Sequence, residues 1–347
     1  MRKFALLVVL LFVLALPVQA LDISAPTVPE IAAEFMPDSP ETFGEGLWEL
    51  IKAVTVKIHP ELTEAAGCCL MLFCATLLIS ILQPVAGGHG KRTAELVSTL
   101  WIAVSLLQPT RSLVNLGIST VYEMSEYGKL LLPVMTAGLA AQGGITKSAA
   151  LYAGTAAFNT ILTSVISALL IPLIYIYLAL SIANNAVGEQ LLKKLRDFAK
   201  WISVWTLKLG LYGFSGYMGL TGVISGTTDA AALKATKMTI SSVVPVIGSI
   251  LSDASETVLV SAGIVKNAAG VYGMLAVLAI CLKPFMTIGI QYLLLKLTGA
   301  VCSTYASKQS SELITDFSTA MGLLLAATGS ICLMLLISTV CFMKGVG

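Results

Sequence analysis

Charge is scarce in this chain. Asp, Glu, Lys and Arg make up 12% of its 347 residues, whereas about a quarter is usual in soluble domains. Hydrophobic residues make up 56%, and several charge-free runs exceed the roughly 18 residues that suggest a membrane-spanning helix. A soluble helical enzyme would need polar outer faces, which these runs lack. The composition therefore predicts an all-α, polytopic membrane protein, and the net charge of +2 without a basic cluster gives no sign of nucleic-acid binding.

The residues that usually carry chemistry are also missing. There are only two histidines, and the seven cysteines form no C-x-x-C pair, so we predict no metal site and no disulfide framework. The chain contains no H-E-x-x-H motif, no G-x-S-x-G elbow, no P-loop and no aspartate pair within an apolar run. We therefore predict neither an enzyme nor a cofactor. The polar candidates for a lined cavity, or for hydrogen bonds between helices, are Asn159, Asn184, Asn185 and Gln291.

The first 20 residues have the pattern of a secretory signal peptide. Arg2 and Lys3 precede an apolar core, and small residues lead up to Ala20. We expect cleavage after Ala20, which places the mature N-terminus outside the cytoplasm. The alternative is an uncleaved first helix.

Residues 21–64 differ from the rest of the chain, with nine acidic residues against two lysines. Four prolines keep the first half irregular, and Phe43–Val56 has the spacing of a short amphipathic helix. This acidic extracytoplasmic segment is either a spacer or a surface that meets the membrane or a partner. Residues 65–347 form the predicted multi-span membrane domain.

The order of crossings follows from charge-free runs and basic loops. Ala65–Ala86 is a predicted span, followed by a basic loop that is expected to stay in the cytoplasm, as is the basic loop 189–200. Thr93–Gln108 and Trp201–Thr228 are expected to cross outward, and Phe317–Met343 forms the last span. Two further apolar regions lie between these segments. Six spans result if the chain crosses once in each of them, and ten result if it crosses three times in each.

Two features of the apolar region Trp201–Thr228 suggest packing or a hinge. Its glycines recur at intervals of three or four residues, which would form a ridge free of side chains that another helix can approach closely. The ridge consists of Gly210, Gly213, Gly216, Gly219, Gly222 and Gly226. Lys208 lies in the same run, either extending to the membrane surface or facing water.

Two stretches of the chain share a plan. Sliding Lys129–Val187 by 112 residues places Pro133 on Pro245 and Pro172 on Pro284. We predict a tandem internal repeat of proline-broken helices, with units at about 93–190 and 197–310, because an apolar run of 41 residues must break to fit a bilayer. In the second unit Lys283 precedes the proline, which predicts an interface or a wet cavity there.

Two stretches resemble the stage III sporulation protein AE family of endospore-forming bacteria. They are LLPVMTAGLAAQGGITKSAALYAGTAAF at 131–158 and, more specifically, residues 207–270, which begin LKLGLYGFSGYMGLTG. The resemblance also covers the signal peptide, the acidic segment and the last span.

The resemblance implies a multi-pass protein of the mother-cell membrane around the forespore. It further implies partners from the same sporulation operon and, through them, a forespore membrane protein, in a channel or secretion-like complex required for endospore formation. No catalytic residue is implied, and a homo-oligomer is left open as a further assembly. Two rivals stay open: a stand-alone small-solute permease, suggested by parallel repeats, and a non-conducting membrane scaffold for the complex.

Overall fold

The computed structural model describes residues 26–36, 43–82, 87–243 and 248–344. The expected signal peptide and Pro245 lie outside these ranges. Every regular element in them is helical. The elements are α2 (Glu30–Ala33), α3 (Phe43–Lys57), α4 (His59–Leu82), α5 (Gly87–Ala141), α6 (Ile145–Val165), the π-helical turn η2 (Ile166–Leu170), α7 (Ile171–Val187), α8 (Gln190–Val243), α9 (Gly248–Cys302) and α10 (Lys308–Met343).

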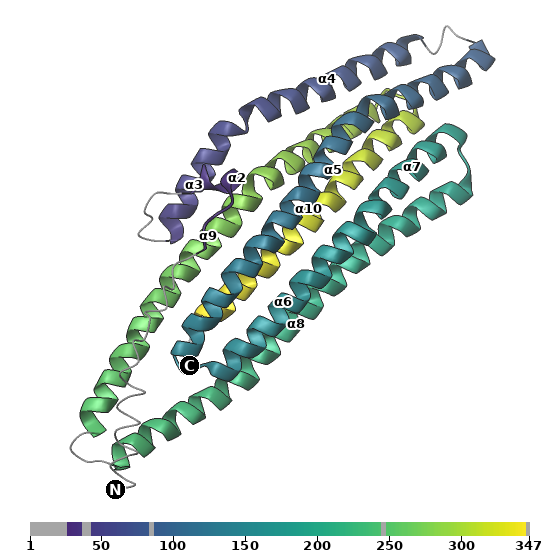
Figure 1. Ribbon diagram of the computed structural model, residues 1–347. Coiled ribbons are helices and arrows are strands. Elements are labelled where there is room, and N and C mark those ends of the chain that lie inside the picture. Colours follow the sequence, from purple (N-terminus) through teal and green to yellow (C-terminus); the bar gives the residue numbers. More distant parts are fainter. Residues whose placement is uncertain (1–25, 37–42, 83–86, 244–247, 345–347) are drawn as a thin grey trace.

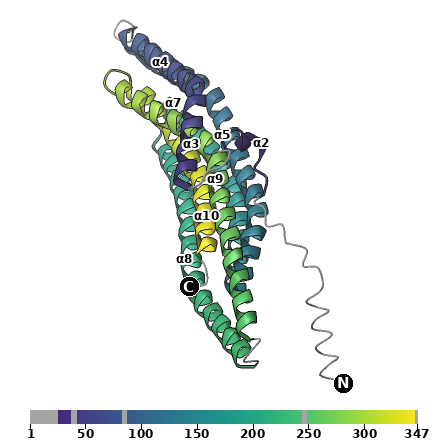
Figure 2. The ribbon, with the colours of Figure 1, turned by 90° about the vertical axis from the view of Figure 1, so that its left-hand side faces the viewer.

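The helices form an elongated bundle around α10 (Figure 1). Helix α10 packs against α9 and α5 most extensively and also against α6, α7 and α8. Helices α5 and α8 lie on opposite sides of it (Figure 2). Helix α4 runs along the outside at one end of the bundle, and α8 and α9 extend past the C-terminus at the other end (Figure 1).

The sequence of α10 explains its central place. The helix begins after Ser307, whose hydroxyl accepts a hydrogen bond from the Ser310 amide, and it carries no charge from Phe317 to Met343. A helix that is apolar all round can be buried on every side. Close packing also needs small partners, and a Cβ atom added to Gly117 of α5 would lie 2.6 Å from Leu324 Cδ1.

Most of the predicted proline breaks are wrong. Helix α5 continues through Pro109 and Pro133, and α9 continues through Pro284. A proline removes one backbone hydrogen bond and costs about 3 kcal/mol in a helix interior. Helices α5 and α9 both pack extensively against α10, which offsets this local cost, so α5 continues past the expected end of a span at Gln108 and past Pro133.

The chain does turn where glycine is required. Gly143 has φ of +89° and connects α5 to α6, and Gly188 has φ of +80° and ends α7. At Pro172 the predicted break is replaced by η2, which ends at Leu170, one residue short of the position before the proline. A π-helical turn is a common way to absorb such a disturbance without ending a helix.

The structure does not confirm the tandem repeat. The first unit contains the turn at Gly143, but the matching position 112 residues later lies inside the uninterrupted helix α9. The sequence match between Lys129–Val187 and Ile240–Leu297 therefore does not correspond to two modules of the same shape.

Four helical stretches in the described residues are long and apolar enough to cross a membrane. They are His59–Ile81, Ile145–Val187, Lys266–Cys302 and Lys308–Met343. The predicted crossings at Ala65–Ala86 and Phe317–Met343 fall within or largely within two of them. Those at Thr93–Gln108 and Trp201–Thr228 belong to α5 and α8, which are not among the four, so neither the six nor the ten expected spans are found.

The predicted short helix before the membrane domain is confirmed as α3, and it is more than a spacer. Leu50 and Val54 are buried against the bundle, where α3 contacts α9. Helix α4 begins at His59 and runs across the expected boundary between residues 64 and 65.

Candidate functional site

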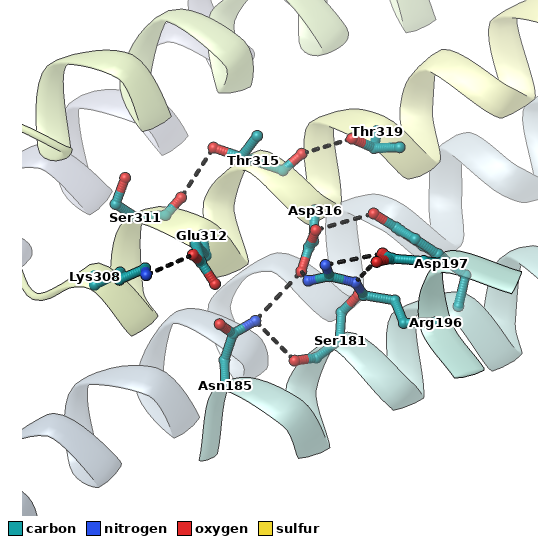
Figure 3. Close-up of polar contacts among 11 residues, drawn as sticks. Ser181, Asn185, Arg196, Asp197, Lys308, Ser311, Glu312, Thr315, Asp316 and Thr319 are labelled. Carbon is teal, nitrogen blue, oxygen red and sulfur yellow. Dashed lines mark hydrogen bonds and ion pairs between the residues drawn. The ribbon is translucent and has the colours of Figure 1, made fainter. Parts of the chain in front are cut away.

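The most deeply buried ion pair of the described residues joins α8 to α10. Arg196 Nη1 lies 2.8 Å from Asp316 Oδ2, and both side chains are 10% exposed. Two further groups from α7 donate to the same carboxylate: Tyr177 Oη at 3.0 Å and Asn185 Nδ2 at 3.3 Å. Figure 3 shows Asn185, Arg196 and Asp316 converging from the three helices.

Arg196 is held by two carboxylates. Its other side contacts Asp197 Oδ1 through Nε at 3.1 Å and Nη2 at 2.9 Å, also visible in Figure 3. Burial acts to lower the pKa of Arg196, but the charges of Asp316 and Asp197 outweigh it and hold this pKa above its ordinary value. The guanidinium therefore stays charged, as a planar donor group with both edges paired.

This arrangement orients helices and offers no reacting centre. A buried pair of this kind stabilises little compared with apolar packing, but breaking it by removing one partner is costly. It therefore fixes the register of α7, α8 and α10. The sequence carries a signal for it, because Arg196 and Asp316 are charged residues at the edges of long apolar runs, but nothing in the sequence indicates that they meet.

A second cluster surrounds Lys283, for which the sequence predicts an interface or a wet cavity. Lys283 Nζ lies 3.3 Å from Glu61 Oε1, and Thr287 donates a hydrogen bond to Glu61 Oε2. Glu61 and Thr287 border a hollow of about 230 Å³ between α4, α5 and α9. Glu64, Cys68, Ser112 and Gln291 also line it.

A third polar cluster lies near the C-terminus. Lys266 of α9 is 2% exposed and donates to Gln142 Oε1 in the α5–α6 turn. Lys147 of α6 is 6% exposed and donates to the backbone oxygen of Lys344 at 3.1 Å. Sequence reasoning missed both lysines as site residues, since each lies near the end of an apolar run, where snorkelling is the usual interpretation.

The polar candidates in the apolar runs mostly connect helices. Asn159 donates to the Ser125 oxygen at 3.1 Å, and Asn185 joins the Asp316 cluster. Asn184 is buried, and its backbone oxygen accepts the Gly188 amide at the end of α7. Gln291 is 5% exposed at the hollow.

The predicted glycine ridge lies on α8, but its members differ in their surroundings. A Cβ atom on Gly210 would lie 3.4 Å from Leu162, and one on Gly213 would lie 3.6 Å from Phe158. Within the part of the chain that the structure describes, a Cβ atom on Gly216 or Gly219 would meet no atom outside its own stretch of helix within 4 Å. Gly222 and Gly226 also fall within α8. The ridge therefore does not bring a second helix of this chain close at Gly216 or Gly219.

The closest contact between a glycine and α8 comes from α6, the helix that also faces Gly210 and Gly213. A Cβ atom on Gly154 of α6 would lie 1.9 Å from Tyr217 Cε1, and Tyr217 donates to the Ala150 oxygen at 2.9 Å. Lys208 is exposed on the outer surface of α8.

No group of three or more His, Cys, Asp or Glu in the described ranges could hold a metal ion. The site chemistry is thus that of ion pairs and hydrogen bonds between helices.

Comparison with known proteins assigns the chain. The family model of stage III sporulation protein AE matches residues 39–345. The chain belongs to the stage III sporulation protein AE family. Stage III sporulation protein AE of Bacillus subtilis (strain 168) is 22% identical over 234 residues, which cover 66% of this chain and 59% of that protein. The aligned part is thus less than two thirds of the relative, and no solved structure matches the chain.

This member of the AE family is therefore a sporulation protein of the membrane type, as its four apolar helical stretches and the family match indicate. The family resemblance predicted from residues 131–158 and 207–270 is confirmed.

Proposed function

We propose that this chain is a non-enzymatic membrane component of the channel or secretion-like complex between mother cell and forespore that endospore formation requires. It sits in the mother-cell membrane around the forespore, with its mature N-terminus outside the cytoplasm. Its partners are other proteins of the same operon and, through them, a forespore membrane protein. The observation that carries the proposal is the family match over residues 39–345.

The surface of the bundle supports a role within an assembly. The apolar stretch His59–Ile81 is only 17% buried by the rest of the chain, although its mean hydropathy is 2.0. Leu70, Leu78 and Ile81 are each more than 60% exposed. Such a helix needs lipid or another protein around it.

The interior supports a component over a stand-alone permease. The hollow beside Glu61 holds about 230 Å³, below the range of about 300–1,000 Å³ typical of small-molecule sites. Asn159 and Asn185 are engaged in bonds between helices and do not line a central path.

The test is affinity purification of a tagged chain from the bacterium that encodes it, at the time of engulfment. We expect the other products of the operon to co-purify, and we expect deletion of the gene to stop sporulation at that stage. A control purification from vegetative cells expressing the tagged chain should lack them. A strictly monomeric protein that transports a solute by itself, without those partners, would establish the permease instead.

A further inference from the structure

The middle of α5 exposes only polar side chains. Between residues 108 and 129 every exposed position of this helix carries a hydroxyl, amide or charged group. We call these eight residues the polar stripe: Gln108, Arg111, Ser112, Asn115, Ser119, Tyr122, Glu126 and Lys129. They recur every three or four residues and so share one face of the helix.

The rest of α5 behaves differently. Toward its N-terminus the exposed large side chains are apolar, among them Val97, Val104 and Leu107. The change at Gln108 shows that the stripe is a distinct stretch rather than the general character of the helix.

The polar stripe lies at the level of an uncharged part of α10. Gly117 of α5 contacts Leu324 of α10, and Gly128 contacts Leu335, both within the uncharged run from Phe317 to Met343. A membrane that contains this run of α10 therefore also contains the polar stripe.

Other helices expose large apolar side chains at the same level, interspersed with hydroxyl groups such as those of Thr160, Tyr212 and Ser215. Asn159 of α6 bonds to the Ser125 oxygen of α5, and Phe158 faces Gly213 of α8, so these positions lie side by side. Around them α6 exposes Ile161, and α8 exposes Leu209.

The apolar surface continues along these helices. Helix α8 carries three aromatic side chains that are about half exposed, Phe198, Trp201 and Trp205. The Trp201 ring contacts the rings of the other two. No charged residue occurs between Lys147 and Glu189 along α6 and α7. The charged residues that α8 exposes in this part of the bundle are Asp197, Lys200 and Lys208, which lie among these aromatic side chains and Leu209.

The bundle is thus two-sided in cross-section. Its α6–α8 side exposes many large apolar side chains, whereas the polar stripe on its α5 side, opposite α8 in Figure 2, exposes no aliphatic one. Exposed charges such as Arg111 and Glu126 are costly toward hydrocarbon, and charged residues at membrane depth usually face a water-filled cavity. Glu126 and Lys129 pair at 2.6 Å but remain 67% and 56% exposed, so the pair itself does not hide them.

We propose that several copies of this chain surround a water-filled passage, with the polar stripe of α5 facing the water and α6 to α8 facing lipid. This deepens and rests on the proposed function as a channel component. Hydroxyl and amide groups at Ser112, Asn115 and Ser119 form the centre of the stripe, with charges of both signs at its ends. Such a lining suits small hydrophilic solutes and ions, without strong selection for one sign of charge.

The first test is cysteine accessibility in a variant of the full chain whose native cysteines are replaced. Asn115→Cys and Ser119→Cys report on the polar stripe, and Ile161→Cys and Leu209→Cys are controls at positions 58% and 62% exposed. Each variant is reconstituted into liposomes and treated with a charged, membrane-impermeant thiol reagent.

We expect the two stripe positions to react at least tenfold faster than the two controls. Equal slow reaction at all four would overturn the proposal, because the stripe would then be covered by protein or lipid. Equal fast reaction at all four would also overturn it, since this part of the bundle would lie outside the bilayer.

The second test counts copies in the same liposomes, by stepwise photobleaching of a single fluorophore on each chain. We expect more than one copy per particle, and reactive stripe positions in a strictly monomeric protein would refute the shared passage. Release of a small entrapped dye should fall at least fivefold when Ser119→Trp narrows the passage, whereas Leu209→Trp should leave it unchanged. Dye release that is unaffected by Ser119→Trp would contradict the lining by α5. These results are independent of co-purification, so a failure here can be told apart from a failure of the proposed function.

Discussion

Removing the carboxylate of Asp316 should destabilise the bundle strongly. The Asp316→Leu substitution leaves Arg196 without its inward partner and takes the acceptor from Tyr177 and Asn185. Breaking a buried pair on one side costs about 3–5 kcal/mol. Because Arg196 keeps its contacts to Asp197, we expect the lower end, about 3 kcal/mol, or roughly a hundredfold in the folding equilibrium.

A double variant separates the effect of the ion pair from the effect of side-chain packing. In the double variant Arg196→Met with Asp316→Leu no charge is left unpaired, and well-packed apolar replacements of ion pairs are often neutral. We expect at least half of the lost free energy of unfolding to return. The hydroxyl of Tyr177 and the amide of Asn185 remain without this acceptor, which keeps the recovery incomplete.

The measurement is reversible unfolding in mixed micelles at increasing mole fraction of a denaturing detergent, followed by helical circular dichroism. Lys308→Met is the matched control, since Lys308 and Glu312 form an exposed pair at 3.9 Å on the same helix. This control should change the free energy of unfolding by less than about 0.5 kcal/mol. Arg196→Met is also measured alone. If the double variant loses as much free energy of unfolding as Asp316→Leu and Arg196→Met together, the two side chains are not coupled and the reasoning is refuted.

Three further outcomes are expected. Gly154→Val should destabilise the isolated chain by about 2 kcal/mol or more, because the Tyr217 ring occupies the space that the new side chain needs. Gly216→Leu should be tolerated. Equal midpoints of detergent unfolding for the two variants would contradict this packing. A cysteine at position 195, where Leu195 is 45% exposed, should be shielded from impermeant thiol reagents in intact cells and one at 38 should react, in a cysteine-free background; reversed labelling would overturn the orientation. The hydrogen bond and charge of Lys57 lower the pKa of Glu34. The contribution of this pair to stability is therefore present above the ordinary carboxylate pKa and is lost as the pH falls from there through the lowered pKa of Glu34. An unchanged dependence of stability on acid pH in Glu34→Gln would show that the pair contributes nothing.

The Gly216 result also bears on assembly. The glycine ridge was predicted to let another helix approach, and at Gly216 and Gly219 this chain supplies none. If Gly216→Leu leaves the isolated chain folded but blocks sporulation, the approaching helix belongs to another molecule; wild-type spore yield would refute close packing at this position.

The sequence by itself determined the class of this protein. Its low charge and long apolar runs predicted helices of the membrane type, the 43–56 pattern predicted α3, and residues 131–158 and 207–270 carried the family. These features depend on composition and local periodicity, which a single sequence displays directly.

Only the tertiary structure decided where the helices end and which charged residues meet. Pro109, Pro133 and Pro284 predicted breaks, but α10 packs against α5 and α9 along their length, and this contact outweighs the local cost of each proline. Arg196 and Asp316 are 120 residues apart in the chain, so their pairing depends on how α8 packs against α10. The polar stripe of α5 likewise becomes distinct only when the neighbouring helices have buried its other faces.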